Sequence, residues 1–187
     1  MRIFVFGLFC VGFCLAGIDL QAQDVKSPQM AGFLSTESED FRVFYEPDVS
    51  LARVYKKISR RRFYVSPKRD FALTNFKEKV TYRMEVLFNK VKETLGMYPV
   101  VARFNIKIFK HRRSVYDEYF RITRSRQRVK SFYLHSARTI YASEDDISDS
   151  ILAHEMAHVI IDHYFIISPP DKVKEMLAVY VDSHLQD

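Results

Sequence analysis

The sequence predicts an α+β fold, in which a small mixed or antiparallel sheet, with an edge strand before the helix at residues 148–165, packs against several helices. Short β-rich runs alternate with longer segments whose apolar residues recur at helical spacing. Apolar residues make up 48% of the chain, which favours a buried core over disorder. Only Gly32 and Gly96 follow residue 22, and an all-β fold with many tight turns needs more glycine.

In the first half of the chain, alternation predicts strands and helical spacing predicts helices. The run FRVFY alternates at residues 41–45, and residues 73–95 carry apolar side chains at every third or fourth position. Gly96 is suited to end that long helix, because glycine adopts the left-handed conformation at low cost. The expected elements are a strand at 41–45, a helix at 49–59, a loop at 60–70, a helix at 73–95, a strand at 100–109 and a helix at 114–122.

In the second half, two short β-rich runs precede two helices. The expected elements are strands at 132–134 and 139–142 joined by a turn at 135–138, and helices at 148–165 and 168–185. The second strand directly precedes its helix, so an edge strand there offers unpaired main-chain groups to an extended peptide. Ser168 is expected to cap the last helix, with Pro169 at its first position.

Residues 1–22 have the shape of a secretory signal peptide. Arg2 precedes an uncharged apolar run at residues 3–18, and small residues follow near Ala22. We expect cleavage after Ala22; cleavage after Ala16 and an uncleaved membrane anchor are the alternatives. The expected location is therefore the bacterial periplasm or the exterior.

The remainder is expected to comprise a flexible N-terminal arm at residues 23–40 and a single domain at 41–187. About 165 residues suit one domain with one core. Both cysteines, Cys10 and Cys14, lie in the expected signal peptide. The exported chain therefore forms no disulfide and offers no thiolate to a metal ion.

The chain is basic, with a net charge of +6 and clusters at residues 60–62, 111–113 and 121–130. Such clusters indicate either contact with an anionic envelope surface or solvated faces of helices and loops. No nucleic-acid motif accompanies the charge, so we expect no nucleic-acid partner. The oligomeric state stays open.

The segment His154-Glu155-Met156-Ala157-His158 is an H-E-x-x-H motif. Positions i and i+4 lie on one face of a helix, so both imidazoles can reach one zinc ion. Glu155 projects roughly 100° around the helix from His154. It can therefore stand beside the metal ion without being a ligand and accept a proton from water.

Other residues near the motif are candidates for supporting roles. Catalytic zinc takes three protein ligands, and Glu175 in the next helix is the candidate for the third. Asp162, one turn beyond His158, and Asp182, two turns beyond Glu175, are candidates to orient a ligand. His163 points away and is expected to be structural. Candidates to polarise a substrate carbonyl are His135, His184, Tyr133, Tyr141 and Tyr180.

The motif HEMAH, followed by EMLAVY, resembles the gluzincin metallopeptidases, the thermolysin-like group in which a downstream glutamate completes a His-His-Glu site. The order of strand, HExxH helix, turn and E-x-L-A-x-Y helix is similar to that of small peptidase-MA-like members, over about residues 131–185. The resemblance implies that His154, His158 and Glu175 bind zinc and that Glu155 is the general base.

These observations predict an exported zinc-dependent metallopeptidase that hydrolyses peptide bonds in a peptide or protein substrate. The alternative is a non-catalytic, zinc-containing module of the same fold that binds peptide or envelope. A third interpretation is a basic envelope-binding protein with a fortuitous HExxH motif, which predicts no zinc.

Overall fold

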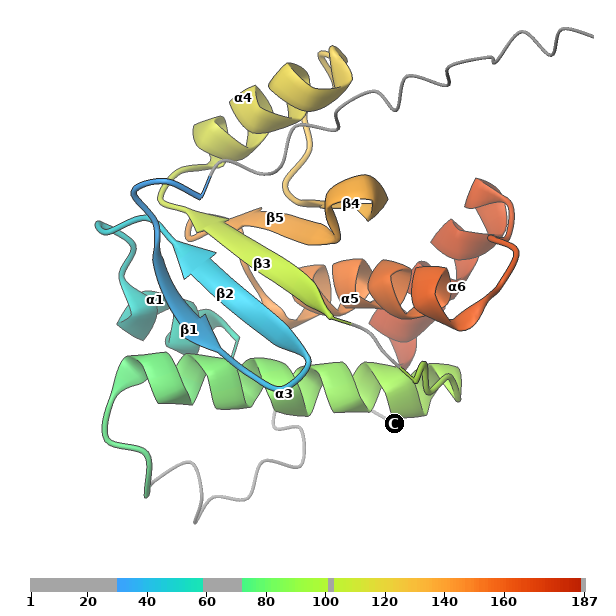
Figure 1. Ribbon diagram of the computed structural model, residues 1–187, viewed down its shortest axis with the longest axis horizontal. Helices are drawn as coiled ribbons and strands as arrows, with labels where there is room; N and C mark the ends of the chain where they lie inside the picture. The colour runs from blue at the N-terminus through green and yellow to red at the C-terminus, as the bar shows by residue number, and fades with distance from the viewer. Residues whose placement is uncertain (1–29, 59–71, 101–102, 186–187) are drawn as a thin grey trace, which may run out of the picture.

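The computed structural model describes residues 30–58, 72–100 and 103–185, and it confirms an α+β fold (Figure 1). Five strands and five α-helices are present in these ranges. In chain order they are β1 (Leu34–Glu37), β2 (Phe41–Tyr45), α1 (Leu51–Lys57), α3 (Phe76–Leu95), β3 (Phe104–Phe109), α4 (Arg112–Thr123), β4 (Phe132–Leu134), the 3₁₀ turn η1 (His135–Ala137), β5 (Thr139–Ser143), α5 (Asp149–Tyr164) and α6 (Asp171–His184). The expected signal peptide at 1–22 and the loop at 60–70 lie outside the described residues.

The sheet is mixed, with the strand order β1-β2-β3-β5-β4. The inner pairs β2–β3 and β3–β5 are parallel, whereas the outer pairs β1–β2 and β4–β5 are antiparallel. β5, directly before α5, is therefore internal, and the expectation of an edge at residues 139–142 is wrong. The edge strand on that side is β4. The turn η1 reverses the chain between β4 and β5, so that β4 pairs antiparallel with the outer side of β5.

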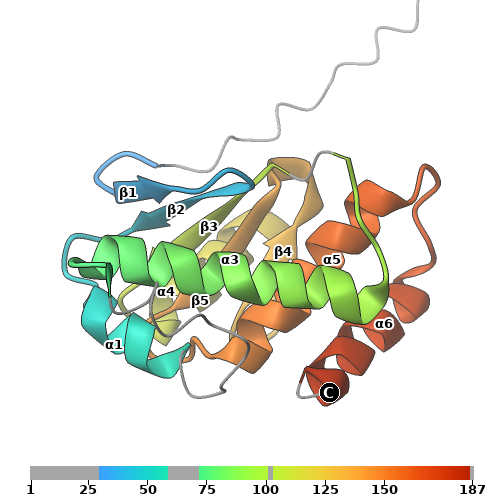
Figure 2. The ribbon, with the colours of Figure 1, turned by 90° about the horizontal axis from the view of Figure 1, so that it is seen from below.

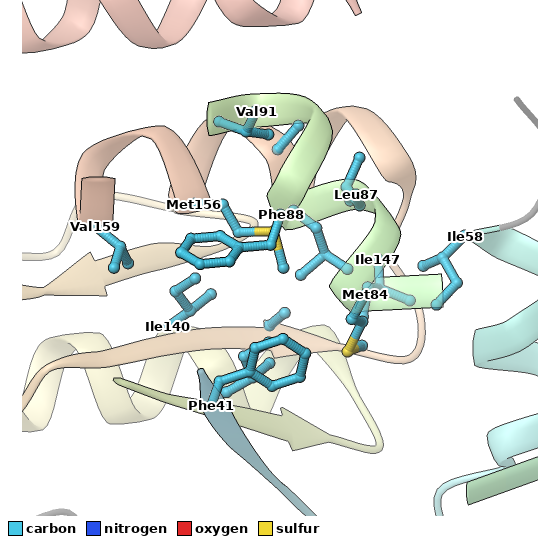
Figure 3. Close-up of a cluster of buried hydrophobic side chains, with 14 of the residues drawn as sticks. Phe41, Ile58, Met84, Leu87, Phe88, Val91, Ile140, Ile147, Met156 and Val159 are labelled. Carbon is cyan, nitrogen blue, oxygen red and sulfur yellow. The ribbon is translucent and has the colours of Figure 1, made fainter. Parts of the chain in front are cut away.

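The main core lies between one face of the sheet and a layer of helices. Figure 2 shows α3 running across this face, and Figure 3 shows the packed side chains. Phe88 and Met84 of α3 are fully buried together with Ile140 of β5 and Met156 of α5. Burial of each such side chain stabilises the fold by about 1.5–3 kcal/mol. This core holds α5 in place beneath the sheet.

The opposite face of the sheet carries α4 and a smaller apolar cluster (Figure 1). Val115 of α4 packs there with Phe109 and Phe132, and the ring of Phe132 stacks on Tyr141 at 4.5 Å between centroids. Tyr141 is thus a core residue of this cluster. It lies in the cluster on the opposite face of the sheet from α5.

The ends of α3 follow local rules of helix capping. The side chain of Asn75 accepts a hydrogen bond from the backbone N–H of Glu78 at 2.9 Å, which satisfies a donor of the first turn. Gly96 ends the helix in the left-handed conformation, with φ 63°. The expected stop at Gly96 is confirmed, although the helix begins three residues later than the pattern at 73–95 predicts.

Two expectations are corrected. Residues 34–37 of the expected flexible arm form β1, paired with β2; their side chains are mostly exposed, so no apolar alternation marks the strand. Ser168 is not the cap of α6, which begins at Asp171 after Pro170 with no side-chain capping bond. The reason is steric, because a residue before proline avoids the helical region and Pro169 precedes Pro170. In the described ranges no helix is long and apolar enough to cross a membrane.

Candidate metal centre

The helix α5 positions both histidines of the motif. The Ser148 hydroxyl caps it by accepting a hydrogen bond from the backbone N–H of Ile151 at 3.2 Å. Leu152 and Met156 are fully buried in the core, which fixes the rotation of the helix about its axis. The side chains of His154 and His158 are therefore held at the rim of the core, with 28% and 15% exposed.

The helix α6 brings Glu175 to these histidines. The Ser168-Pro169-Pro170 segment turns the chain, and α6 packs along α5 through the buried residues Ala178 and Val181. Glu175 lies on the side of α6 next to the histidine pair, and its side chain is 61% exposed. The two helices thus supply the three candidate ligands.

The three ligand atoms converge on one point. His158 Nε2 lies 3.3 Å from His154 Nε2, and the Glu175 carboxylate lies 3.6 Å from His154 Nε2 and 3.4 Å from His158 Nε2. Ligands about 2.0–2.1 Å from a tetrahedral zinc ion are roughly 3.3–3.4 Å apart. His154, His158 and Glu175 therefore form a group that can hold a metal ion.

Burial also favours the protonation state of His158 that can bind a metal ion. Removal from water lowers the pKa of His158; the neighbouring Glu175 carboxylate opposes this shift and His154 adds to it. A lowered pKa keeps the imidazole neutral near pH 7, and only the neutral ring offers a lone pair to a metal ion.

Glu155 lies beside the ligand group but does not belong to it. Its side chain is buried, and Oε1 accepts a hydrogen bond from the Ser131 hydroxyl at 2.6 Å. A second hydrogen bond comes from the backbone N–H of Tyr133 in β4. Burial raises the pKa of Glu155 to about 7; the hydrogen bonds oppose that shift and the Glu175 charge adds to it.

The ligand group opens onto a cleft of about 480 Å³. His154, Glu155, His158 and Glu175 line it, together with residues of the segment 127–133. A second depression of about 450 Å³ shares His154, Glu155 and Ser131 with the first. Residues of the segment 127–133 therefore line both depressions beside the candidate ligand group. A further cavity of about 520 Å³, near the β1–β2 turn, contains none of these residues.

The two aspartates expected to orient ligands bond elsewhere. Asp162 accepts a hydrogen bond from His135 Nδ1 at 2.9 Å and lies 3.7 Å from Lys174 Nζ. Asp182 accepts a hydrogen bond from the Ser150 hydroxyl. Among the described residues, neither carboxylate is hydrogen-bonded to a ring of the ligand pair. His163 Nδ1–H donates a hydrogen bond to the Val159 carbonyl at 2.8 Å, a contact within α5 that fits the expected structural role.

The candidates for a carbonyl-polarising residue are separated by the fold. His135 and Tyr133 line the cleft, whereas Tyr141 belongs to the core on the other face of the sheet. Tyr180 and His184 stack on each other at the exposed end of α6. Sequence reasoning did not find Ser131, because a serine before a strand carries no signal of a contact 24 residues away.

Comparison of the chain with protein-family models, curated proteins and solved structures gives no match. What stands beside the H-E-x-x-H motif is therefore a possible metal-binding group of His154, His158 and Glu175 in an α+β fold.

Proposed function

We propose that this chain is an exported zinc-dependent metallopeptidase. The observation that carries the proposal is the convergence of two imidazoles and one carboxylate at separations of 3.3–3.6 Å, close to the edge lengths of a zinc tetrahedron, with Glu155 next to them off the ligand face. Three protein ligands leave one position open, as catalytic zinc sites require.

Zinc suits the donor set, because neutral imidazole binds it readily and a carboxylate completes the His-His-Glu type of site. A zinc ion held there supplies Lewis-acid chemistry: it lowers the pKa of a water molecule and polarises a peptide carbonyl.

Glu155 is the proposed general base. Its carboxylate would accept a proton from water as the water oxygen bonds to the peptide carbonyl carbon, and the resulting carboxylic acid would pass that proton to the amine as the C–N bond breaks. A pKa of about 7, raised chiefly by burial, makes both protonation states accessible at neutral pH. The Ser131 hydroxyl and the Tyr133 N–H hold the carboxyl group in one orientation beside the ligands.

A peptide is the proposed substrate. β4 is the sheet edge that borders the cleft, and an extended chain can add to such an edge by main-chain hydrogen bonds. His135 lies in the same cleft with its ring oriented by Asp162, within reach of a bound peptide.

The substitution Glu155→Gln tests the proposal. Glutamine keeps the size of the side chain and one acceptor oxygen for Ser131, but it removes the base. We expect near-stoichiometric zinc and a parental fold, with peptide hydrolysis reduced about 10²–10⁴-fold, mainly in kcat. Hydrolysis is measured with a broad peptide library at neutral pH and a chelator blank. Glu93→Gln, the same change at an exposed site on α3, is the matched control.

Two other outcomes decide against the proposal. Equal hydrolysis by the parent and by Glu155→Gln contradicts the assigned base. A zinc-loaded parent without hydrolysis supports the non-catalytic peptide- or envelope-binding module, once removal of residues 23–29 has excluded inhibition by that segment. Truncation stops there because β1 belongs to the sheet. A chain that binds no zinc supports a basic envelope protein with a fortuitous motif.

A further inference from the structure

An unusual share of exposed apolar side chains gathers in one part of the chain. The α5–α6 loop presents Ile166, which is fully exposed, and Ile167, which is 85% exposed. The exposed set that we call the apolar surface comprises Tyr164, Phe165, Ile166, Ile167, Val173, Met176, Val179 and Tyr180. Contiguous exposed apolar groups mark an interaction site on a folded protein, whereas scattered ones do not.

The helical part of this surface faces away from the core. Ala178 and Val181 are the buried residues of α6, and Met176 and Tyr180, four residues apart, lie on the opposite side of the helix. Figure 1 and Figure 2 show α6 at the periphery of the molecule, packed beside α5. In the described part of the chain, the outer face of α6 has no covering element.

A basic loop lies beside the same helix. Residues 124–130 (RSRQRVK) contain four cations and no acid. Arg124, Arg126, Arg128 and Lys130 are all exposed, and within the described ranges none of them forms an ion pair. By contrast, Arg121, just before them, is paired with Glu118. No ion pair within the described ranges therefore compensates the positive charge of the loop.

The loop and α6 are neighbours. Arg128 and Lys130 line one depression together with Ser150 of α5 and Asp182 of α6. Asp182 is the one acid in that depression besides Glu155, and its carboxylate is engaged by Ser150. The basic loop thus lies beside α6 at Asp182, which is one helical turn from Val179 of the apolar surface.

We propose that the apolar surface and the basic loop form one docking surface for an anionic lipid bilayer. Exposed isoleucines at a loop tip, with aromatic rings beside them, can enter the boundary between headgroups and acyl chains. Cations near such a surface are attracted by anionic headgroups. Charge complementarity favours lipid over a second copy of the chain, because the partner copy carries the same uncompensated loop.

The proposal goes beyond the proposed hydrolysis and does not depend on it. Val179 of the apolar surface lies one helical turn beyond Glu175 on α6, so the surface borders the ligand group, and docking would bring the cleft close to the bilayer. Because binding needs no turnover, the Glu155→Gln variant is expected to bind vesicles as the parent does. Failure of hydrolysis and failure of docking are therefore separable.

The test is co-sedimentation of the purified protein with vesicles. We expect binding to an equal mixture of phosphatidylcholine and phosphatidylglycerol, little binding to phosphatidylcholine alone, and weaker binding as salt is raised. N-terminal sequencing first establishes that each variant and the parent begin at the same residue. Any contribution of residues 1–22 to vesicle binding is then the same in both proteins.

Two variants address the two halves of the surface. Ile166→Asp with Ile167→Asp should weaken binding at least about tenfold by removing the apolar tip. Its control is Val100→Asp, which places an aspartate at a fully exposed apolar residue outside the apolar surface. Arg126→Glu should weaken binding at least about fivefold. Its control is Lys56→Glu on the exposed side of α1. All five substituted sites are exposed, so the fold should tolerate the changes.

Three results would overturn the proposal. The first is equal binding to both vesicle types or to neither. The second is parental binding by both surface variants. The third is a dimer, detected by sedimentation, that Ile166→Asp with Ile167→Asp dissociates; the surface would then be an interface between copies of the chain.

Discussion

At the scale of single residues, the candidate centre contains two titratable side chains, one basic and one acidic, whose pKa values are shifted by burial. His158 is partly buried with its pKa lowered chiefly by loss of water, and Glu155 is buried with its pKa raised to about 7 for the same reason. Both shifts favour the neutral forms of these groups. The hydrogen bonds that Glu155 accepts from Ser131 and Tyr133 offset part of the cost of burying its carboxylate.

The role of Glu175 as third ligand can be tested by its removal. Glu175→Ala should weaken zinc binding by more than about 100-fold, since loss of an outer hydrogen-bond partner alone costs roughly 10–100-fold. Affinity is measured by competition with a chromogenic chelator. Asp171→Ala, the loss of a carboxylate 96% exposed on the same helix, is the control and should bind zinc as the parent does.

Unchanged zinc affinity in Glu175→Ala would show that the third ligand is wrong. Asp162, Asp171 and Asp182 would then be the candidates. Asp171→Ala tests one of these candidates. If Asp171→Ala loses zinc affinity and Glu175→Ala does not, Asp171 is the third ligand.

At the scale of elements, Glu144 joins the sheet to α1. Its carboxylate accepts hydrogen bonds from the backbone N–H of Ser50, the cap of α1, at 2.6 Å, from Lys110 Nζ at 2.8 Å and from Arg53 at 3.0 Å. Burial alone raises the pKa of Glu144, but these donors outweigh it, so the pKa lies below its ordinary value. The charged form therefore stabilises the packing of α1.

The substitution Glu144→Gln should lower the free energy of unfolding by about 1–3 kcal/mol at pH 7. A carboxyl group with a lowered pKa contributes stability above its unfolded pKa, and that contribution is lost as pH falls through the folded pKa. The difference from the parent should thus shrink below about pH 4. Urea unfolding of both proteins, at pH 7 and at a pH below about 4, measures this difference.

The control is Glu37→Gln, which removes the charge from an exposed ion pair with Arg42 and should change the free energy of unfolding by less than about 1 kcal/mol. If Glu144→Gln lowers the free energy of unfolding equally at both pH values, the charge of Glu144 is not the source of the stabilisation.

At the scale of the whole molecule, the ligand group links α5 to α6. A metal ion that binds only the folded chain stabilises it by mass action, by about 2.7 kcal/mol when its concentration is 100 times Kd. For a domain of this size we expect an increase in Tm of about 5–10 °C with zinc, reversed by chelator. Differential scanning calorimetry measures the shift, and His154→Ala, which lacks a ligand, should show none. A Tm indifferent to both zinc and chelator would count against a site that links the two helices.

Local features of the fold could be predicted from the sequence. The alternation in FRVFY predicts β2, the apolar spacing and Gly96 predict α3 and its end, and the two short runs predict the β4–β5 hairpin. Each depends on interactions between residues a few positions apart. β1 could not be predicted, because an exposed edge strand needs no apolar alternation and exists by pairing with β2.

The sequence by itself determined the pairing of His154 with His158, because helix geometry places positions i and i+4 on one face wherever the helix lies. Only the tertiary structure decided which groups surround that pair. The approach of Glu175 depends on the packing of α6 along α5, and the bonds of Ser131 to Glu155 and of His135 to Asp162 depend on where β4 and η1 lie against α5. These contacts join residues 17 to 27 positions apart, and no local spacing rule fixes the distance between them.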